Sequence, residues 1–287
     1  MTAITAAPPT PAPAVLRRPA TRSIAAPLGT LIKRRFALSA HTPREIVVPL
    51  MTPILFSVVI APALAKVTGS IRGIDYMSFV AIGTVGLLVP LNCMFAGIGV
   101  IVDRQSGARR DLLAAPMPRS LIVFGNLAVA LAISAFQVVA LLGAALLRGA
   151  QFDARPTGIA FFAAATALLA IAMYGGAEIL ANRIAKQEEY IGAVPAIAIV
   201  PWFFAGSLFP IAALPTFLGA FAKVLPLTHA LALMRYGLLD GHATGLHDIW
   251  GMTNATAMAA LSLAVVAAYA ALLLGLSVRV FSRAAVK

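Results

Sequence analysis

The segment Val102–Ser120, VDRQSGARRDLLAAPMPRS, is short and charged, and it separates two of the longest apolar stretches in the chain. These stretches, residues 76–101 and 121–147, contain no Asp, Glu, Lys or Arg. Each exceeds the roughly 20 residues that an α-helix needs to cross a bilayer. The segment itself carries four arginines, and arginine-rich loops stay on the cytoplasmic side of a membrane. The sequence therefore predicts two membrane-spanning helices joined by a cytoplasmic loop, which is either a docking surface or only a determinant of topology.

Composition places the whole chain in the membrane class. Of its 287 residues, 61% are hydrophobic and 11% are charged, whereas soluble domains carry about 25% charged residues. The net charge of +12 comes from basic residues spread over loops, without a basic face interleaved with aromatic side chains. Such charge favours contact with anionic lipid and argues against a nucleic-acid partner. One cysteine and four scattered histidines give no metal-ligand spacing, so we expect no metal site.

Apolar stretches predict an all-α integral membrane protein with six transmembrane helices. The expected spans are residues 46–65, 76–101, 121–147, 157–181, 190–209 and 254–278. With this topology, 16 of the 22 Lys and Arg residues lie on the cytoplasmic side and both termini are cytoplasmic. A seventh span would send the basic C-terminus outward, so six spans fit the charges better.

Two segments outside the spans have distinct patterns. Residues 1–27, rich in Ala, Pro and Thr, predict a disordered cytoplasmic tail ahead of a membrane domain over 28–287. Residues 28–40 predict an amphipathic helix along the cytoplasmic headgroups, although a basic flank that only orients the first span is an equal alternative. Its two faces are Leu28, Leu31, Ile32 and Phe36 on the apolar side and Lys33, Arg34 and Arg35 on the basic side.

The stretch before the last span is apolar but interrupted. Prolines and charges break it at Pro215, Lys223, Pro226 and Arg235, so no part of it is long enough to span cleanly. We expect a re-entrant pair of short helices, residues 215–225 and 227–239, dipping into the outer leaflet.

Chemistry-bearing motifs are scarce. No G-x-x-x-x-G-K-[ST] occurs, so we expect no ATP site of the P-loop kind on this chain, and no catalytic constellation lies in the spans. Glu178 is the one acid within an expected span. Its place near the cytoplasmic end favours an ion pair with Arg183 or Lys186 over a proton relay. An enzyme is therefore not expected.

Two motifs carry a family resemblance. Residues 95–107 with 112–119 resemble the segment of daunorubicin-resistance permeases in which an acidic-basic-x-x-Gly element precedes L-x-x-x-P. Residues 208–215 and 225–235 resemble the stretch after span five in nodulation-factor and polysaccharide exporters. Over residues 28–280 the chain thus resembles a type-2 ABC exporter permease, with Asp103 where many relatives have Glu.

This resemblance implies a location in the cell membrane and two permease subunits, identical or different. They would be paired with two ATPase subunits, which bind ATP and Mg²⁺. The residues expected to couple the chain to an ATPase are Asp103, Arg104, Gly107, Arg109, Arg110, Asp111 and Arg119. Those expected to line a cargo path at the seam between permeases are Asn92, Phe95, Trp202, Phe203 and Phe204. The re-entrant motif comprises Pro226, Thr228, His229 and Arg235.

The expected cargo is a hydrophobic or amphiphilic molecule, with a drug or antibiotic first and a lipid or lipid-linked glycan second. A channel or carrier that works without ATP is the rival reading.

Overall fold

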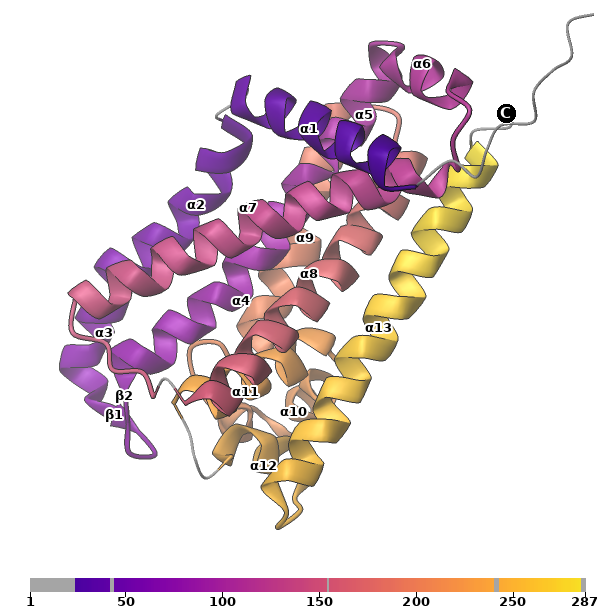
Figure 1. The fold of residues 1–287 in the computed structure, drawn as a ribbon. Coiled ribbons are helices and arrows are strands. Elements are labelled where there is room, and N and C mark those ends of the chain that lie inside the picture. The colour runs from indigo at the N-terminus through magenta and orange to yellow at the C-terminus, as the bar shows by residue number, and fades with distance from the viewer. Residues whose placement is uncertain (1–23, 42–43, 154, 240–242, 285–287) are drawn as a thin grey trace, which may run out of the picture.

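The computed structural model describes residues 24–41, 44–153, 155–239 and 243–284, and nearly all of them lie in helices (Figure 1). Most of the expected tail, residues 1–23, lies outside this set. In chain order the elements are α1 (Ala25–His41), α2 (Arg44–Leu55), a π-helical turn (Phe56–Ile60), α3 (Ala61–Thr68), β1 (Ser70–Ile71), β2 (Ile74–Asp75), α4 (Tyr76–Ala96), α5 (Ile98–Gln105), α6 (Ala108–Ala114), α7 (Ser120–Leu147), α8 (Pro156–Arg183), α9 (Gln187–Phe204), a 3₁₀ turn (Ile211–Ala213), α10 (Thr216–Ala222), α11 (Pro226–Leu238), α12 (Thr244–Trp250) and α13 (Ala255–Ala284).

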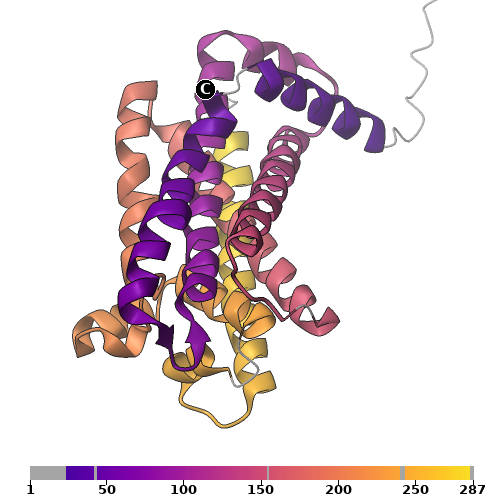
Figure 2. The ribbon, with the colours of Figure 1, turned by 90° about the vertical axis from the view of Figure 1, so that its left-hand side faces the viewer.

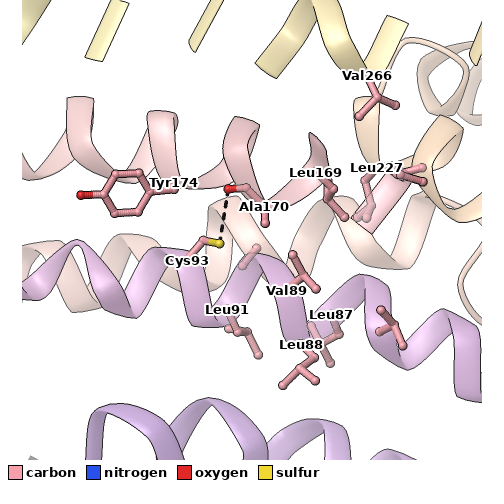
Figure 3. Packing of buried hydrophobic residues seen from close by; sticks show 14 of the residues in the cluster. Leu87, Leu88, Val89, Leu91, Cys93, Leu169, Ala170, Tyr174, Leu227 and Val266 are labelled. Carbon is pink, nitrogen blue, oxygen red and sulfur yellow. Dashed lines mark hydrogen bonds between the residues drawn. The ribbon is translucent and has the colours of Figure 1, made fainter. Parts of the chain in front are cut away.

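Helix α4 forms the centre of the bundle. Its side chains are buried at almost every position from Tyr76 to Met94, as expected for a helix that is apolar on all sides. Helices α2, α7, α8 and α9 pack around it. Figure 3 shows Leu87, Leu88, Val89 and Leu91 in this core, with the Cys93 thiol donating a hydrogen bond to the Ala170 carbonyl of α8.

Four of the described helices are long and apolar enough to cross a membrane. They are Tyr76–Gln105, Ser120–Leu147, Pro156–Arg183 and Ala255–Arg283, and the bent pair α10–α11 makes five if it counts as one span. The chain is therefore an all-α, multi-pass membrane protein. The segments expected as spans at 46–65 and 190–209 are helical but do not meet the same length and hydropathy test.

The expected first span is not one continuous α-helix. It is divided into α2, the π-helical turn and α3. Pro53 lies within α2 and Pro62 in the first turn of α3, directly after the π turn. A proline inside a helix lacks the N–H donor and its ring crowds the carbonyl four residues earlier, so the chain changes its hydrogen-bond spacing there.

The expected second span runs four residues further than predicted. Helix α4 is interrupted at Gly97, whose N–H turns back to the carbonyls of Met94 and Phe95, and α5 continues to Gln105. The charged segment therefore begins as helix and not as loop. Its first charges, Asp103 and Arg104, do not end the helix because each has a partner on another helix.

The region after α9 contains the predicted pair of short helices and a third helix that was not predicted. Helix α9 ends at Phe204, five residues before the expected end of the span, and Gly206 then takes a left-handed conformation. Helices α10 and α11 meet at a bend of 81°. Helix α12 follows, and the exposed ion pair between Arg72 and Asp248 (2.9 Å) joins it to the β1–β2 hairpin.

The bundle has two distinct ends. Helix α1 lies across the ends of the long helices, near α6 and the C-terminal end of α13 (Figures 1 and 2). We call this the α1 end. The β1–β2 hairpin and α12 lie at the opposite end (Figure 1). There α8 crosses α11 at Gly158 and Gly237, where a Cβ on either glycine would overlap the backbone of the other, so the helices touch backbone to backbone.

Candidate functional site

At the α1 end, α1 is tied to α5 by charged groups. Asp103 accepts two hydrogen bonds from the Arg34 guanidinium, at 2.7 and 3.3 Å, and its side chain is only 11% exposed. Arg35 is buried and donates to the Ala96 carbonyl (3.3 Å), where α4 ends. A Cβ at Gly99 would collide with the Arg35 guanidinium, so glycine leaves room for this contact.

The predicted faces of the α1 helix were wrong in part. The buried face is Leu31, Arg35 and Ser39, which lie four residues apart, and Phe36 of the supposed apolar face is exposed. Of the three basic residues only Lys33 is exposed. The reason is that carboxylate and carbonyl acceptors on α4 and α5 satisfy Arg34 and Arg35, so burying them is not penalised as an unpaired charge would be.

Arg104 joins α5 to the C-terminal end of α8. Its guanidinium donates to the carbonyls of Ala181 (3.0 Å), Ile184 (2.6 Å) and Ala185 (3.2 Å). The last carbonyls of a helix have no partner within it and carry its partial negative charge, so a cation is favoured there. Arg104 is thus a helix cap supplied from another part of the chain.

Arg109 faces into the bundle from α6. Its guanidinium donates to the Asn182 side chain (2.9 Å) and lies 4.6 Å from the centre of the Phe281 ring of α13. Burial lowers the pKa of Arg109, the nearby Glu178 raises it and Arg104 lowers it again. Arginine has so high an intrinsic pKa that it stays charged at neutral pH. Arg109 therefore acts as a fixed cation beneath α6.

Glu178 is fully buried below Arg109, and the predicted ion pair with Arg183 or Lys186 is wrong. The carboxylate accepts hydrogen bonds from the hydroxyl of Tyr174 (2.7 Å) and the amide of Asn182 (3.1 Å). These donors lie four residues before and four residues after Glu178, on the same face of α8. That spacing was visible in the sequence and is the signal that could have found both partners.

The exposed charges of the segment are therefore fewer than predicted. Asp103, Arg104 and Arg109 bind within the chain, whereas Arg110 and Asp111 are exposed on α6. Gly107, in the left-handed conformation, directly precedes α6. Arg119 is also exposed and donates to the Ser282 carbonyl of α13 (3.2 Å). Helix α6 is held at both ends and presents Arg110 and Asp111 to the outside.

The residues proposed for a cargo path are not gathered on one surface. Asn92 is buried and donates to the Ala130 carbonyl (3.1 Å) and the Ser134 hydroxyl (2.7 Å) of α7. Trp202 is fully buried and donates to the Gly83 carbonyl of α4 (2.7 Å). In this conformation both residues join helices of one chain and do not line a surface.

The other residues proposed for the path are more accessible. Phe203 is 45% exposed on α9, while Phe204 packs edge-to-face against Phe221 of α10. Phe95 is partly buried near the end of α4. Of the proposed set, Phe203 is the one side chain placed to meet a molecule outside the subunit.

The hairpin motif is built around Arg235. Its guanidinium is buried, lies 3.5 Å from the centre of the Phe79 ring and donates to the carbonyls of Gly206 (2.6 Å) and Ser207 (2.8 Å). It thus holds the irregular segment after α9, whose carbonyls lack helical partners. In the same motif Pro226 begins α11 and the Thr228 hydroxyl is buried without a hydrogen-bond partner in the described part of the chain.

His229 completes the hairpin motif. Its ring lies between the Ser262 hydroxyl (3.2 Å) and the Lys223 carbonyl (2.9 Å), so it ties α11 to α13 and to the end of α10. Thr228 and Arg235 of the motif line one pocket together with Phe79 and Gly206, whereas Pro226 and His229 are not among the residues that line it.

Sequence reasoning overlooked Tyr190. Its hydroxyl donates to the Met94 carbonyl (2.7 Å), and a Cβ at Gly97 would collide with it. The tyrosine thereby joins α9 to the break between α4 and α5. No spacing in the sequence signals this contact, because its two members lie 96 residues apart. Among the described residues, no group of three His, Cys, Asp or Glu side chains could hold a metal ion.

The structure thus combines a bundle of long apolar helices with α1 across one end and the charged segment of α5 and α6 beside it. Residues 27–239 match the family model described as ABC-2 type transporter. The chain belongs to the ABC-2 type transporter family, and it is accordingly the transmembrane subunit of an ABC transporter.

Two curated relatives are similar to the chain over most of its length. The inner membrane transport permease YadH of Escherichia coli strain K12 is 25% identical over 209 residues, which cover 72% of this chain and 78% of that protein. Nodulation protein J of Sinorhizobium fredii is 26% identical over 189 residues, covering 64% of this chain and 71% of that protein. The predicted family is confirmed. Subunits of this family have no catalytic activity of their own and work with an ABC ATPase subunit.

Proposed function

We propose that this chain is one of two permease subunits of an ATP-driven exporter that moves a hydrophobic or amphiphilic molecule, drug- or antibiotic-like, out of the cell. Two separate ATPase subunits would bind ATP and Mg²⁺ and supply the work. The observation that carries the proposal is the way α6 is held: its exposed charges stand on a helix fixed to α8 and α13.

The coupling step follows from that arrangement. Arg110 and Asp111 are of opposite sign and adjacent, so they suit a groove on the ATPase that also carries both signs. Because Arg104 and Arg109 connect α5 and α6 to α8, a displacement of α6 is passed to a long helix and not lost in a flexible loop. This differs from the expectation that Arg109 itself exchanges ion pairs with the ATPase.

The proposed orientation places the α1 end in the cytoplasm, with both termini inside and six membrane crossings. The supporting observation is charge: the arginines of the 102–120 segment and of α1 all lie at this end. The broken helix α2–α3 and the proline-containing α9 would then be the first and fifth crossings, and α10–α11 a re-entrant hairpin at the outer face.

The proposed seam between the two permeases uses α2 and α9, which both pack on α4. Helix α4 is enclosed by its own chain, so it is unavailable as a seam in this conformation. In contrast, α2 exposes Met51, Ile54 and Leu55, and α9 exposes Phe203. Exposed apolar surface of this extent suits a partner subunit or an amphiphilic cargo.

The test uses the ATPase that copurifies with the tagged chain, reconstituted with it in liposomes. We expect Arg110→Glu to lower permease-stimulated ATP hydrolysis at least fivefold, the equivalent of about 1 kcal/mol at a charged interface. Arg148→Glu is the matched control, because Arg148 is an equally exposed arginine at the other end of α7.

Cargo and energy source are tested in inside-out vesicles. ATP-dependent uptake of daunorubicin would support drug export, whereas uptake of a fluorescent phospholipid alone would assign the chain to lipid export. Transport by the chain alone without nucleotide, or failure of any ATPase to copurify, would overturn the proposal.

A further inference from the structure

A groove on the side of the bundle runs along α8 toward the end where α1 lies, and neither α6 nor the exposed Phe203 of α9 lines it. It has a volume of about 340 Å³ and lies among α4, α8, α9 and α13. This volume is in the range of roughly 300–1,000 Å³ that small-molecule sites occupy. Its walls include Met173, Gly176, Ile179 and Leu180 of α8 and Leu273 of α13. Apolar side chains therefore surround whatever fills it.

The groove opens onto an apolar surface. Ile197, one of its lining residues, is exposed on α9, and Leu272 and Leu276 are exposed on α13. In a multi-pass membrane protein such a surface meets hydrocarbon and not water. An acyl chain can therefore enter from the side, while a polar solute has no favourable route.

The length of the groove matches one leaflet of a bilayer. Its α8 wall runs from Ala172 to Arg183, and eleven steps of 1.5 Å each give about 17 Å. The hydrocarbon core of a bilayer is about 30 Å thick, so each leaflet contributes about 15 Å. A lipid tail that follows this face of α8 would reach from the headgroup level to the middle of the membrane.

Arg183 lines the groove at its end and is the one charged residue among the lining residues. It is exposed, and in the described part of the chain it has no acidic partner, whereas Arg104 binds carbonyls on both sides of it. Lys186, also exposed, follows three residues later. A cation at the end of α8 and at headgroup depth attracts a lipid phosphate, at about 1 kcal/mol for each basic residue.

The geometry points to a binding site for one anionic phospholipid, with an acyl chain in the groove between α8 and α13 and the phosphate against Arg183. With the orientation proposed above, the lipid belongs to the cytoplasmic leaflet. Only this choice of leaflet depends on the proposed function, and the binding itself does not.

Gly176 allows a direct test of the groove. A Cβ built at Gly176 meets no atom within 4 Å, so a larger side chain fits there without disturbing the helices. Gly176→Leu would fill the groove beside Met173. Gly143→Leu is the matched control, since Gly143 is also free of contacts within 4 Å and lies on α7, away from the groove. Gly175 is unsuitable, because a Cβ there would overlap the backbone of Leu273 and Leu274.

The experiment is native mass spectrometry of the purified full chain in detergent with dioleoylphosphatidylglycerol or dioleoylphosphatidylcholine. We expect the unmodified chain to retain one phosphatidylglycerol in preference to phosphatidylcholine. Gly176→Leu should lower retention of both lipids by about tenfold, because the groove is overfilled, and Gly143→Leu should leave retention unchanged. Arg183→Gln should reduce the preference for phosphatidylglycerol about fivefold, as expected for loss of one basic residue.

Three results of this experiment would contradict the lipid site. Equal retention by the unmodified chain and Gly176→Leu would overturn the site, as would equal retention of the two lipids by the unmodified chain. A complex with the mass of two chains and no bound lipid would also overturn it, because a second copy of the chain would then cover the groove. Because lipid retention is measured without ATP or ATPase, failure here is distinguishable from failure of the proposed export activity.

Discussion

The ion pair between Arg34 and Asp103 should contribute measurably to stability, and its size can be worked from the structure. The closest atoms are 2.7 Å apart, and the side chains are 31% and 11% exposed. Two unit charges about 4 Å apart interact by about 4 kcal/mol at the effective dielectric constant of 20 that suits protein surfaces. Because water reaches Arg34 and screens the charge, we expect a coupling of about 1–2 kcal/mol between the two residues.

A double-mutant cycle measures this coupling. Arg34→Gln, Asp103→Asn and the double variant are unfolded with SDS in mixed micelles, and their free energies of unfolding are compared with that of the unmodified chain. The losses of stability in the two single variants should together exceed the loss in the double variant by the coupling energy. A coupling below about 0.3 kcal/mol, which is within the error of additivity, would show that α1 is not fastened to α5 by this pair.

Three further substitutions test the packing. Tyr174→Phe removes one of two donors to the buried Glu178 carboxylate and should cost about 1–3 kcal/mol of unfolding free energy in the same titration; no change would refute the buried pair. Gly158→Val overlaps the α11 backbone and should cost about 3 kcal/mol or more, whereas Gly143→Val should be tolerated. Arg235→Lys replaces the two guanidinium nitrogens that donate to the Gly206 and Ser207 carbonyls with a single ammonium and should lower the thermal midpoint in detergent; an unchanged midpoint would count against that role.

The positions of most helices could be predicted from the sequence, because they depend on the composition of each local stretch. Apolar stretches free of charge placed the long helices within a few residues, and prolines with a basic residue separated residues 215–225 from 227–239, close to the observed α10 and α11. Pro53 and Pro62 mark the break in the first expected span, but they do not indicate its π-helical form. Helix α12 was missed because seven residues are too few to show an apolar period.

The directions of individual charged side chains could not be read in the same way. Arg35 faces inward to donate to the Ala96 carbonyl, and Arg104 faces α8 to donate to carbonyls at its end. These acceptors lie 61 and about 80 residues away in the sequence, so no local pattern indicates them. Sequence patterns treat an arginine next to a span as a surface charge, which is the common case. Only the tertiary structure shows which arginines bind within the chain and which, like Arg110, are exposed on its surface.

Helix α8 runs unbroken between the two ends of the bundle. Its C-terminal carbonyls are held by Arg104 of α5, and near its N-terminus Gly158 rests on the backbone of α11 at Gly237. Twenty-eight residues of unbroken helix span about 42 Å. Arg104→Ala removes the contacts that hold one end of α8 and should thus speed hydrogen exchange in residues 226–238 at the opposite end of the bundle. A displacement of α5 at one end of the bundle would then be passed along α8 to α11 at the other.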